Sequence, residues 1–305
     1  MFQSHFGEIA ALLTAMFWAV TSLSFEQAGK RIGSLTVNLI RLYIAFGIYT
    51  VYLYFVRGIP FPLDATKEAW LWLSLSGLVG FAIGDLLLFQ AFVVVGARIS
   101  MLIMALVPPI TALTGWLILG ETLSLQSVMG MVLTISGVSL VVLKRGVPEL
   151  NSKGKNRIKF SYPAVGILLA FGGAVGQAVG LVLSKFGMKD YNAFAASQIR
   201  VLAGLVGFTI IFFIMRRWGR VWKGLKNRKG MLFTGLGSVF GPFLGVSFSL
   251  LAVQHTDTGV AATIMSIVPI LLILPAVFLF REKVNIREII GSFIAVGGVA
   301  LLFME

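Results

Sequence analysis

Cysteine is absent from this chain of 305 residues, and histidine occurs only twice, at His5 and His255. The first absence excludes disulfide bonds and thiolate metal sites, and two histidines are too few for a histidine-built metal centre. Charge is also scarce, because charged residues make up 12% of the chain, against about 25% in soluble domains. Hydrophobic residues instead reach 58%, with a mean hydropathy of +0.94. The composition excludes a soluble globule and predicts an all-α integral membrane protein without metal or cofactor.

Apolar runs of about 20 residues, the length that crosses a bilayer core, recur along the whole chain. We expect ten transmembrane helices, at roughly 7–27, 35–56, 69–92, 97–118, 125–143, 163–184, 193–215, 231–253, 259–280 and 286–303. Most connections are short, but residues 144–159 and 216–229 are longer and basic. We therefore predict a first five-helix repeat at 1–145, a basic cytoplasmic linker at 146–161 and a second five-helix repeat at 162–305.

The two halves carry related sequences in one register. Residues 80–140 match residues 241–301 at a fixed offset of 161. The matched pairs include glycine, proline and glutamate as well as apolar residues: Gly80–Gly241, Gly84–Gly245, Ile103–Ile264, Met104–Met265, Val107–Val268, Pro108–Pro269, Glu121–Glu282, Gly130–Gly291 and Gly137–Gly298. Proline and glycine held at matched depths are hard to obtain from shared hydrophobicity alone. Two homologous apolar halves are typical of a duplicated membrane transporter.

The number of spans and the placement of positive charge predict the topology. Because five is odd, the second half must enter the membrane upside down relative to the first, which gives an inverted repeat. Most of the 25 Lys and Arg residues lie in the loops after spans 1, 3, 5, 7 and 9; the exceptions are Arg57, Lys67, Lys185, Lys189 and the intramembrane Arg41 and Arg200. Positive residues stay cytoplasmic, so we expect both termini on the extracytoplasmic side of a plasma (inner) membrane.

The segment from Arg216 to Lys226 interleaves tryptophan with cations. This pattern would suit an RNA-binding patch, but it is also typical of a juxtamembrane segment on the anionic inner leaflet. We favour the second interpretation, which makes the lipid bilayer the partner of this segment and predicts no nucleic acid.

Prolines at membrane depth are the first candidates for the lining of a cavity. Pro108 and Pro269 are repeat partners in the middle of spans 4 and 9. Proline removes a backbone donor, and the break persists in hydrocarbon only where protein or a water-filled cavity satisfies the freed carbonyl. We predict that both prolines line a cavity at the midplane. The alternative is a kink tolerated within a packed helix.

Buried polar groups are the second set of candidates. Asp85 lies inside span 3, where a carboxylate costs about 2.5–3.5 kcal/mol on insertion scales and usually marks a substrate or proton path. Its repeat partner is Val246, so the fold does not require it. We predict that Asp85 binds a substrate cation or couples protons; an interhelical hydrogen bond or a shallow position are the alternatives. Gln90, Gln177 and Trp18 are further candidates for the cavity lining.

Two charged repeat pairs suit gating or anchoring better than substrate binding. Arg41 and Arg200 match at an offset of 159, near the starts of their helices and on opposite sides of the membrane. A long cationic side chain in such a place can reach the nearer interface. Glu121 and Glu282 end spans 4 and 9, where we expect caps or gate contacts.

Glycines recur at short spacings in three of the expected spans. They are Gly172, Gly176 and Gly180 in span 6, Gly77, Gly80 and Gly84 in span 3, and Gly237, Gly241 and Gly245 in span 8. Small residues at this spacing let helix backbones approach closely. We therefore assign them to helix packing.

A recurring pattern of mid-span proline, terminal glutamate and spaced glycines resembles the drug/metabolite transporter superfamily, in particular its EamA-type members. The residues are Val107-Pro108, Leu119-Gly120-Glu121, Gly130 and Gly137-Val138, repeated as Val268-Pro269, Arg281-Glu282, Gly291 and Gly298-Val299, with Arg41 and Arg200 in the second helix of each half. The resemblance implies spans 1–4 and 6–9 around a central cavity, spans 5 and 10 at the periphery, and export or exchange of small metabolites such as amino acids. Arg281, Asp85 and Arg98 depart from the pattern and leave the substrate open.

These observations favour a gradient-driven secondary transporter, most simply an exporter of small metabolites such as amino acids, with protons as a coupling ion. No glycine-rich phosphate loop with Lys and Ser/Thr occurs, so ATP is not the expected energy source. Alternatives are a nucleotide-sugar, organic-phosphate or drug antiporter, and a non-transporting receptor or assembly protein. An intramembrane enzyme would need clustered acid, base or metal groups, and we do not expect one.

Overall fold

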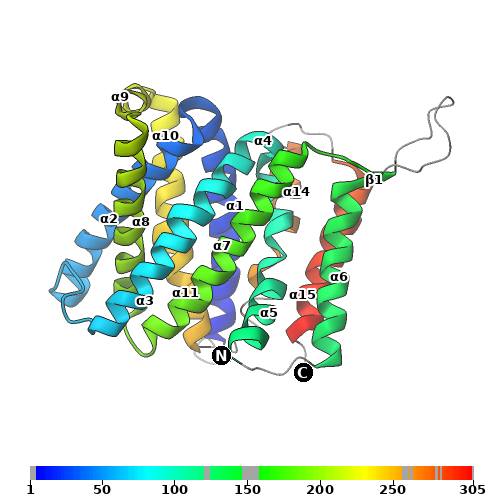
Figure 1. Cartoon of the computed structure of the whole chain (residues 1–305), viewed down its shortest axis with the longest axis horizontal. Helices are drawn as coiled ribbons and strands as arrows, with labels where there is room; N and C mark the ends of the chain where they lie inside the picture. Colours follow the sequence, from blue (N-terminus) through cyan, green and yellow to red (C-terminus); the bar gives the residue numbers. More distant parts are fainter. Residues whose placement is uncertain are drawn as a thin grey trace.

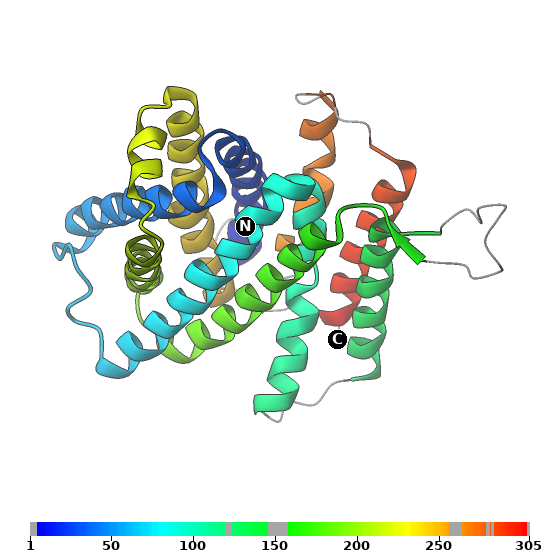
Figure 2. The ribbon, with the colours of Figure 1, turned by 45° about the horizontal axis from the view of Figure 1, so that its top comes forward.

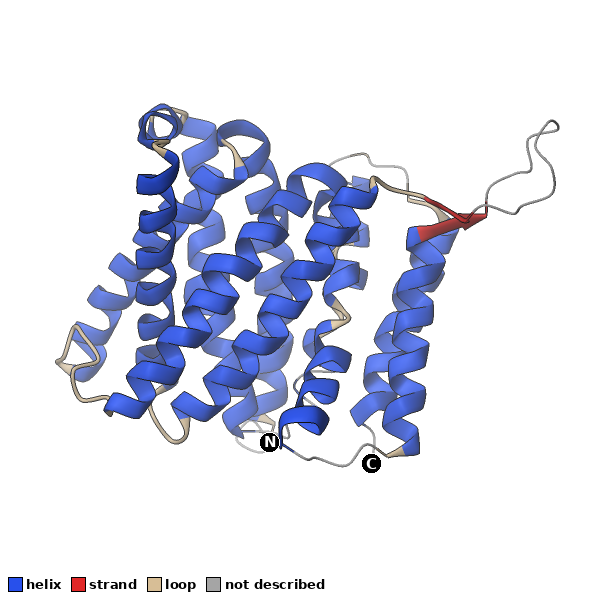
Figure 3. Ribbon diagram, viewed as in Figure 1, coloured by secondary structure: helices blue, strands red, loops and turns tan. Residues whose placement is uncertain are grey.

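The computed structural model describes residues 5–119, 124–145, 158–255, 261, 264–278, 281 and 284–303. These residues are almost all helical (Figure 3). Seven continuous helical stretches of the described residues are long and apolar enough to cross a membrane. Two of them, Lys67–Met104 and Arg228–Ala252, each consist of several consecutive helices. A shorter apolar helical stretch covers Val268–Phe278. The strands β1 (Leu143–Arg145) and β2 (Ile158–Phe160) form one short antiparallel pair. The chain is an α-helical membrane bundle, as the composition predicted.

The helices fall into two sets. The first half contains α1 (Phe6–Ile32), α2 (Ser34–Arg57), α3 (Lys67–Gly77), the π-helix η1 (Leu78–Gly84), α4 (Asp85–Met104), α5 (Val107–Leu119) and α6 (Leu125–Val142). The second half contains α7 (Ala164–Met188), α8 (Ala193–Met215), α9 (Trp218–Leu225), α10 (Arg228–Ser238), the π-helix η2 (Val239–Gly245), α11 (Val246–His255), α13 (Val268–Leu271), α14 (Ile273–Phe278) and α15 (Ile286–Phe303).

The sequence repeat is also a repeat of helix boundaries. The elements α10, η2, α11, α13 and α15 each begin 161 residues after α3, η1, α4, α5 and α6, as Arg228 does after Lys67. Both halves even contain a π-helical segment at the same place, although π-helices are rare. The matched register therefore reflects two copies of one structural unit.

Gly96 divides the third expected span from the fourth. Its φ of 85° and ψ of 160° are not helical, and a positive φ of this size favours glycine. The chain reverses direction within α4, at the top of the bundle in Figure 1. A second break, at Ala105 and Leu106, separates α4 from α5.

The two halves pack crosswise and run in opposite directions. Gly84 at the end of η1 lies against α7, where a Cβ on Gly176 would be 2.6 Å from the Gly84 Cα. Its repeat partner Gly245 lies against α1, where a Cβ would be 2.8 Å from the indole of Trp18. The third span of each half thus contacts the first span of the other. Because α1 starts at the end of the bundle where the termini lie and α7 starts at the other end, the repeat is inverted (Figure 1).

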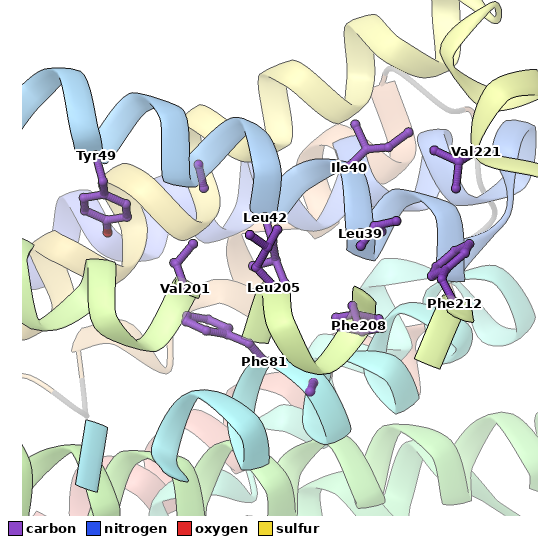
Figure 4. Close-up of a cluster of buried hydrophobic side chains, with 12 residues drawn as sticks. Leu39, Ile40, Leu42, Tyr49, Phe81, Val201, Leu205, Phe208, Phe212 and Val221 are labelled. Carbon is purple, nitrogen blue, oxygen red and sulfur yellow. The ribbon is translucent and has the colours of Figure 1, made fainter. Parts of the chain in front are cut away.

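An apolar core joins α2, α8 and η1. Leu42 and Tyr49 of α2 lie with Leu205 and Phe208 of α8, and Phe81 of η1 completes the cluster (Figure 4). These side chains come from both halves, so the core ties the two repeats together.

The helices α6 and α15 form a pair at one edge of the molecule, side by side in both views (Figures 1 and 2). Four glycines let their backbones touch: a Cβ on Gly130 or Gly137 would be 2.5 Å from a backbone nitrogen of α15, and Gly291 and Gly298 are equally crowded by α6. The resemblance implied this peripheral position for the last helix of each half.

We expect Gly298→Ala to destabilise the protein, because its Cβ would collide with the backbone and hydroxyl of Thr134. Overpacking of this kind costs about 1–3 kcal/mol. The neighbouring Gly297 is a matched control, since a Cβ there meets nothing within 4 Å. Thermal unfolding in detergent should show a lower melting temperature for Gly298→Ala and none of this loss for Gly297→Ala. Equal melting temperatures would mean that the helices do not touch at Gly298.

Candidate functional site

A buried ion pair lies between α2 and the start of α4. The Nη2 of Arg41 is 2.5 Å from the Oδ2 of Asp85, and the two side chains are only 3% and 6% exposed. The sequence predicted Asp85 as a site residue and treated Arg41 separately. The Arg41 side chain is long enough to extend to the nearer interface. It does not do so, because it pairs with a carboxylate in the interior.

Asn38 positions this pair from one helical turn away. It precedes Arg41 by three residues, so both side chains lie on one face of α2. Its Oδ1 accepts a hydrogen bond from the Arg41 Nε at 3.0 Å, and its Nδ2 donates to the backbone carbonyl of Asp85 at 3.1 Å. Asn38 was not predicted from the sequence. Its spacing from Arg41 was the available signal.

The second half of the chain supplies another ligand to the same carboxylate. The Nε2 of Gln177, in α7, donates to the Oδ1 of Asp85 at 2.7 Å. This contact is possible because Gly84 and Gly176, next to the two residues in sequence, let η1 and α7 approach closely. The glycine pattern therefore serves helix packing, as predicted. The structure brings Asp85 and Gln177 together across the two repeats.

Aromatic rings surround the Arg41 guanidinium. Its Cζ lies 4.5 Å from the ring centre of Phe89, 5.6 Å from that of Phe81 and 5.7 Å from that of Phe25. Cation–π contacts of this kind partly replace hydration for a cation taken out of water. The pair is held by charge, hydrogen bonds and ring faces at once.

Arg200 approaches Phe81 from the other half. Its Cζ lies 5.0 Å from the ring centre, and the residue is 5% exposed. The backbone of Arg200 packs against Gly77, where a Cβ would meet the Arg200 carbonyl. Its Nε is buried and finds no hydrogen-bond partner among the residues that the structure describes. The two repeat-related arginines therefore meet at one ring, but among the described residues only Arg41 of the two forms an ion pair with a carboxylate.

The remaining polar candidates lie apart from this cluster. Trp18 packs against Gly245 and joins a small apolar cluster with Val268 and Leu272. The Oε1 of Gln90, an exposed residue, accepts a hydrogen bond from the Ser34 hydroxyl at 2.5 Å.

The two prolines open new helices. Pro108 follows the break at Ala105 and Leu106, and Pro269 follows an equivalent turn before α13. A proline in the first turn of a helix needs no backbone donor, so the interruption precedes each proline. Pro269 is buried and Pro108 is half-buried. The predicted gate residues Glu121 and Glu282 lie outside the described residues.

Two pockets are found away from these residues. One of about 400 Å³ lies beside Gly96, where α1 and α4 meet, and is lined by Glu26, Lys30, Val93, Val94, Val95, Gly96, Arg98, Ile99 and Tyr162. The other, of about 580 Å³, is an apolar groove along α2 against Phe243. Neither is lined by any predicted cavity residue. The central cavity therefore stays a prediction.

The pocket beside Gly96 contains charged groups in fixed places. The Oε2 of the buried Glu26 accepts a hydrogen bond from the backbone nitrogen of Ala97 at 2.7 Å, and its Oε1 pairs with Lys30. On the far wall, Arg98 of α4 pairs with Glu288 of α15 at 2.5 Å. This second pair joins the halves at the end of the bundle opposite the termini.

A smaller cluster joins the halves at the end where the termini lie. The Nη2 of Arg57 is 2.5 Å from the Oδ2 of Asp64, and the Tyr191 hydroxyl donates to the Oδ1 of Asp64 at 2.8 Å. Burial acts to raise the pKa of Asp64, but hydrogen bonds from Tyr191 and Arg57 outweigh it and hold that pKa below its ordinary value.

This cluster makes stability depend on pH in acid. A carboxyl whose pKa is lowered by folding stabilises the fold above its unfolded pKa of about 3.9, and the contribution is lost as the pH falls through the lower folded pKa. We expect the melting temperature of the wild type to fall more, from about pH 5 to about pH 3, than that of Asp64→Asn. The difference should be small, because the Asp64 side chain is 38% exposed and screened by solvent. The control is Asp190→Asn, in the neighbouring loop, whose melting temperature should fall as much as that of the wild type. Equal plots of melting temperature against pH for Asp64→Asn and the wild type would contradict the prediction.

Comparison with known proteins agrees with this architecture. A model of the EamA-like transporter family matches residues 5–143 and 164–304. A solved structure titled only "Crystal structure of protein" is similar over 97% of this chain and 95% of its own, with 16% identity and a TM-score of 0.61. At this identity the likeness shows the fold alone. A search of curated proteins finds no match.

Proposed function

Because this chain belongs to the EamA-like transporter family, a family of membrane transporters, we propose that it moves a small polar metabolite, such as an amino acid, through a midplane site between its repeats. The observation that carries the proposal is the cluster of Arg41, Asp85 and Gln177, which joins the two repeats deep in the bundle. Ionisable groups at membrane depth usually lie on substrate or proton paths.

The distribution of bonds within the cluster suits alternating access. Arg41, Asn38 and Asp85 all belong to the first repeat, so the ion pair can move as one unit with that half. Among the described residues, the one hydrogen bond of this cluster that crosses to the second repeat is that from Gln177 to Asp85. A hydrogen bond to a charged group contributes about 1.5–3 kcal/mol, which rocking of one half against the other can break and restore. The hydrogen bond between Gln177 and Asp85 would then form in one arrangement of the halves and be absent in the other.

We assign the direction as export across a plasma (inner) membrane, with a gradient as the energy source. The resemblance to EamA-type transporters supports export, and the placement of Lys and Arg supports termini on the extracytoplasmic side. A reporter fused to the C-terminus tests this topology, and a cytoplasmic reporter signal would overturn it.

Flux into proteoliposomes tests the function itself. Purified protein would be reconstituted and supplied with labelled amino acids, with and without a pH gradient, and protein-free vesicles would be the control. We expect uptake above the control that increases with the gradient. If no amino acid moves while a phosphate ester does, the chain is an organic-phosphate antiporter instead. If no small molecule moves, the receptor or assembly alternative gains support.

A further inference from the structure

Arg41 and Arg200 occupy equivalent positions but have unequal partners. Each lies seven residues after the first residue of its helix, α2 or α8. Arg41 pairs with Asp85, whereas Arg200 makes neither a hydrogen bond nor an ion pair with any residue of the described ranges. A guanidinium without a counter-ion is costly at membrane depth.

A second unpartnered polar group lies on the same face of α8. Ser197 precedes Arg200 by three residues, which places both side chains on one side of the helix. Ser197 is 0% exposed, and its hydroxyl lies near that of Tyr49. The Tyr49 hydroxyl is already bonded to the Pro242 carbonyl and the Ser247 hydroxyl, and no hydrogen bond of good geometry reaches Ser197 from the part of the chain that the structure describes. Buried polar groups are normally hydrogen-bonded. A hydroxyl and a guanidinium left unsatisfied together point to a ligand that is not part of the chain.

The first half shows what such a pair of side chains binds. At the offset of 159 that relates Arg41 to Arg200, Ser197 is the repeat partner of Asn38. Asn38 and Arg41 both hold Asp85, through its backbone carbonyl and its carboxylate. Arg200 in the second half is therefore the counterpart of the residue that holds a carboxylate, and Ser197 is the counterpart of the polar residue beside it.

The second half lacks that carboxylate. Val246 stands where Asp85 stands in the first half, directly after η2 as Asp85 directly follows η1. It packs against the apolar cluster that contains Phe81 and Leu205. The chain thus repeats the cation and its polar neighbour, but not the anion.

We propose that Arg200 and Ser197 bind a carboxylate of the transported molecule, in the role that Asp85 fills for Arg41. The proposal rests on the transport function proposed above and defines its substrate class. The two arginines and Asp85 leave an excess of one positive charge, which a single carboxylate neutralises. A phosphate ester, with about 1.5–2 negative charges near neutral pH, would overcompensate. The face of Phe81 holds the Arg200 guanidinium in place for the anion.

Supplying the missing carboxylate within the chain tests the site without any ligand. Val246→Asp should pair with Arg200 and melt at or above the temperature of Val246→Asn, although an aspartate at membrane depth normally destabilises. The double variant Val246→Asp/Arg200→Met should melt lowest, because its new carboxylate has no counter-ion. If the double variant melts no lower than Val246→Asp, the two side chains do not pair and the proposal is overturned.

Small anions test the site in the purified protein. Potassium propionate should raise the melting temperature of the wild type by a few degrees relative to potassium chloride, through preferential binding to the folded state. Propionate should not raise the melting temperature of Arg200→Met, because this variant lacks the cation. It should not raise that of Val246→Asp either, because the new carboxylate fills the site. An equal shift in all three proteins, or none in the wild type, would overturn the proposal. A shift with inorganic phosphate but not propionate would overturn the assignment to carboxylates.

These melting experiments use no membrane and no gradient, so they separate the two proposals. An Arg200-dependent shift with propionate, but without flux in vesicles, would support the binding site and count against the transport function as proposed. Flux of amino acids that is unchanged in Arg200→Met would support transport and overturn the role of Arg200.

Discussion

Replacing Arg41 with methionine is expected to lower the free energy of unfolding by about 3–5 kcal/mol, because the Asp85 carboxylate is then buried without its counter-ion. The ion pair has almost no access to solvent, since its side chains are 3% and 6% exposed. Water cannot replace the lost guanidinium there. Methionine fills much of the same space between Phe25, Phe81 and Phe89, so the loss should come from charge and hydrogen bonding. Thermal or denaturant unfolding in detergent measures it.

Two further variants separate this effect from a general defect of packing. Removing both charges, in Arg41→Met/Asp85→Leu, should recover most of the loss, because an apolar pair often replaces a buried ion pair at little cost. Arg200→Met, at the repeat-related position, should lower the free energy of unfolding less than Arg41→Met does, since no carboxylate pairs with Arg200 in the described ranges. An Arg41→Met protein as stable as Arg200→Met would show that the Arg41–Asp85 pair is not formed.

Replacing Asp85 with asparagine is expected to remove the response of transport to a pH gradient. Asparagine keeps the shape of the side chain and can still accept a hydrogen bond from Gln177, but it cannot take up and release a proton. A proton arriving at Asp85 would break its ion pair with Arg41 and weaken its bond to Gln177, which links protonation to the contact between the repeats. The initial rate of labelled amino acid uptake, with and without the gradient, measures the response.

The control for this prediction is a carboxyl group at the surface. Glu68 pairs with Lys189, and both side chains are more than half exposed. Glu68→Gln should therefore keep the full response to the gradient. A response that survives in Asp85→Asn would exclude Asp85 as the coupling group, provided that the variant melts within a few degrees of the wild type.

The repeat was the most informative part of the sequence for the fold. An offset of 161 between proline and glycine positions predicted two equivalent units, and the helix boundaries and the two π-helices follow that offset. The last helices of the halves were expected at 125–143 and 286–303, and they lie at Leu125–Val142 and Ile286–Phe303. Such features are set locally, by the length of apolar runs and by glycine and proline, so a single sequence contains them.

The partners within the site could not be obtained in that way. Asp85 is separated from Arg41 by 44 positions and from Gln177 by 92, and hydrophobic periodicity says which face of a helix is buried but not which helix it meets. Arg41 was expected to extend toward the interface because it lies near a helix start. Its actual direction depends on the position of the start of α4 beside α2. Asn38 and Ser197 were missed because small polar residues are common in membrane helices and become informative only beside the arginines.

The pairing of α6 with α15 has a consequence for the origin of the chain. Gly130 lies against Gly298, and Gly137 lies against Gly291. Exchanging each residue for its repeat partner turns the first contact into the second, so the interface is self-complementary, as between the subunits of a symmetric dimer. A single five-helix ancestor that inserted into the bilayer in both orientations would have formed this contact with its own copy, before gene fusion allowed the halves to differ, with Asp85 in one and Val246 in the other.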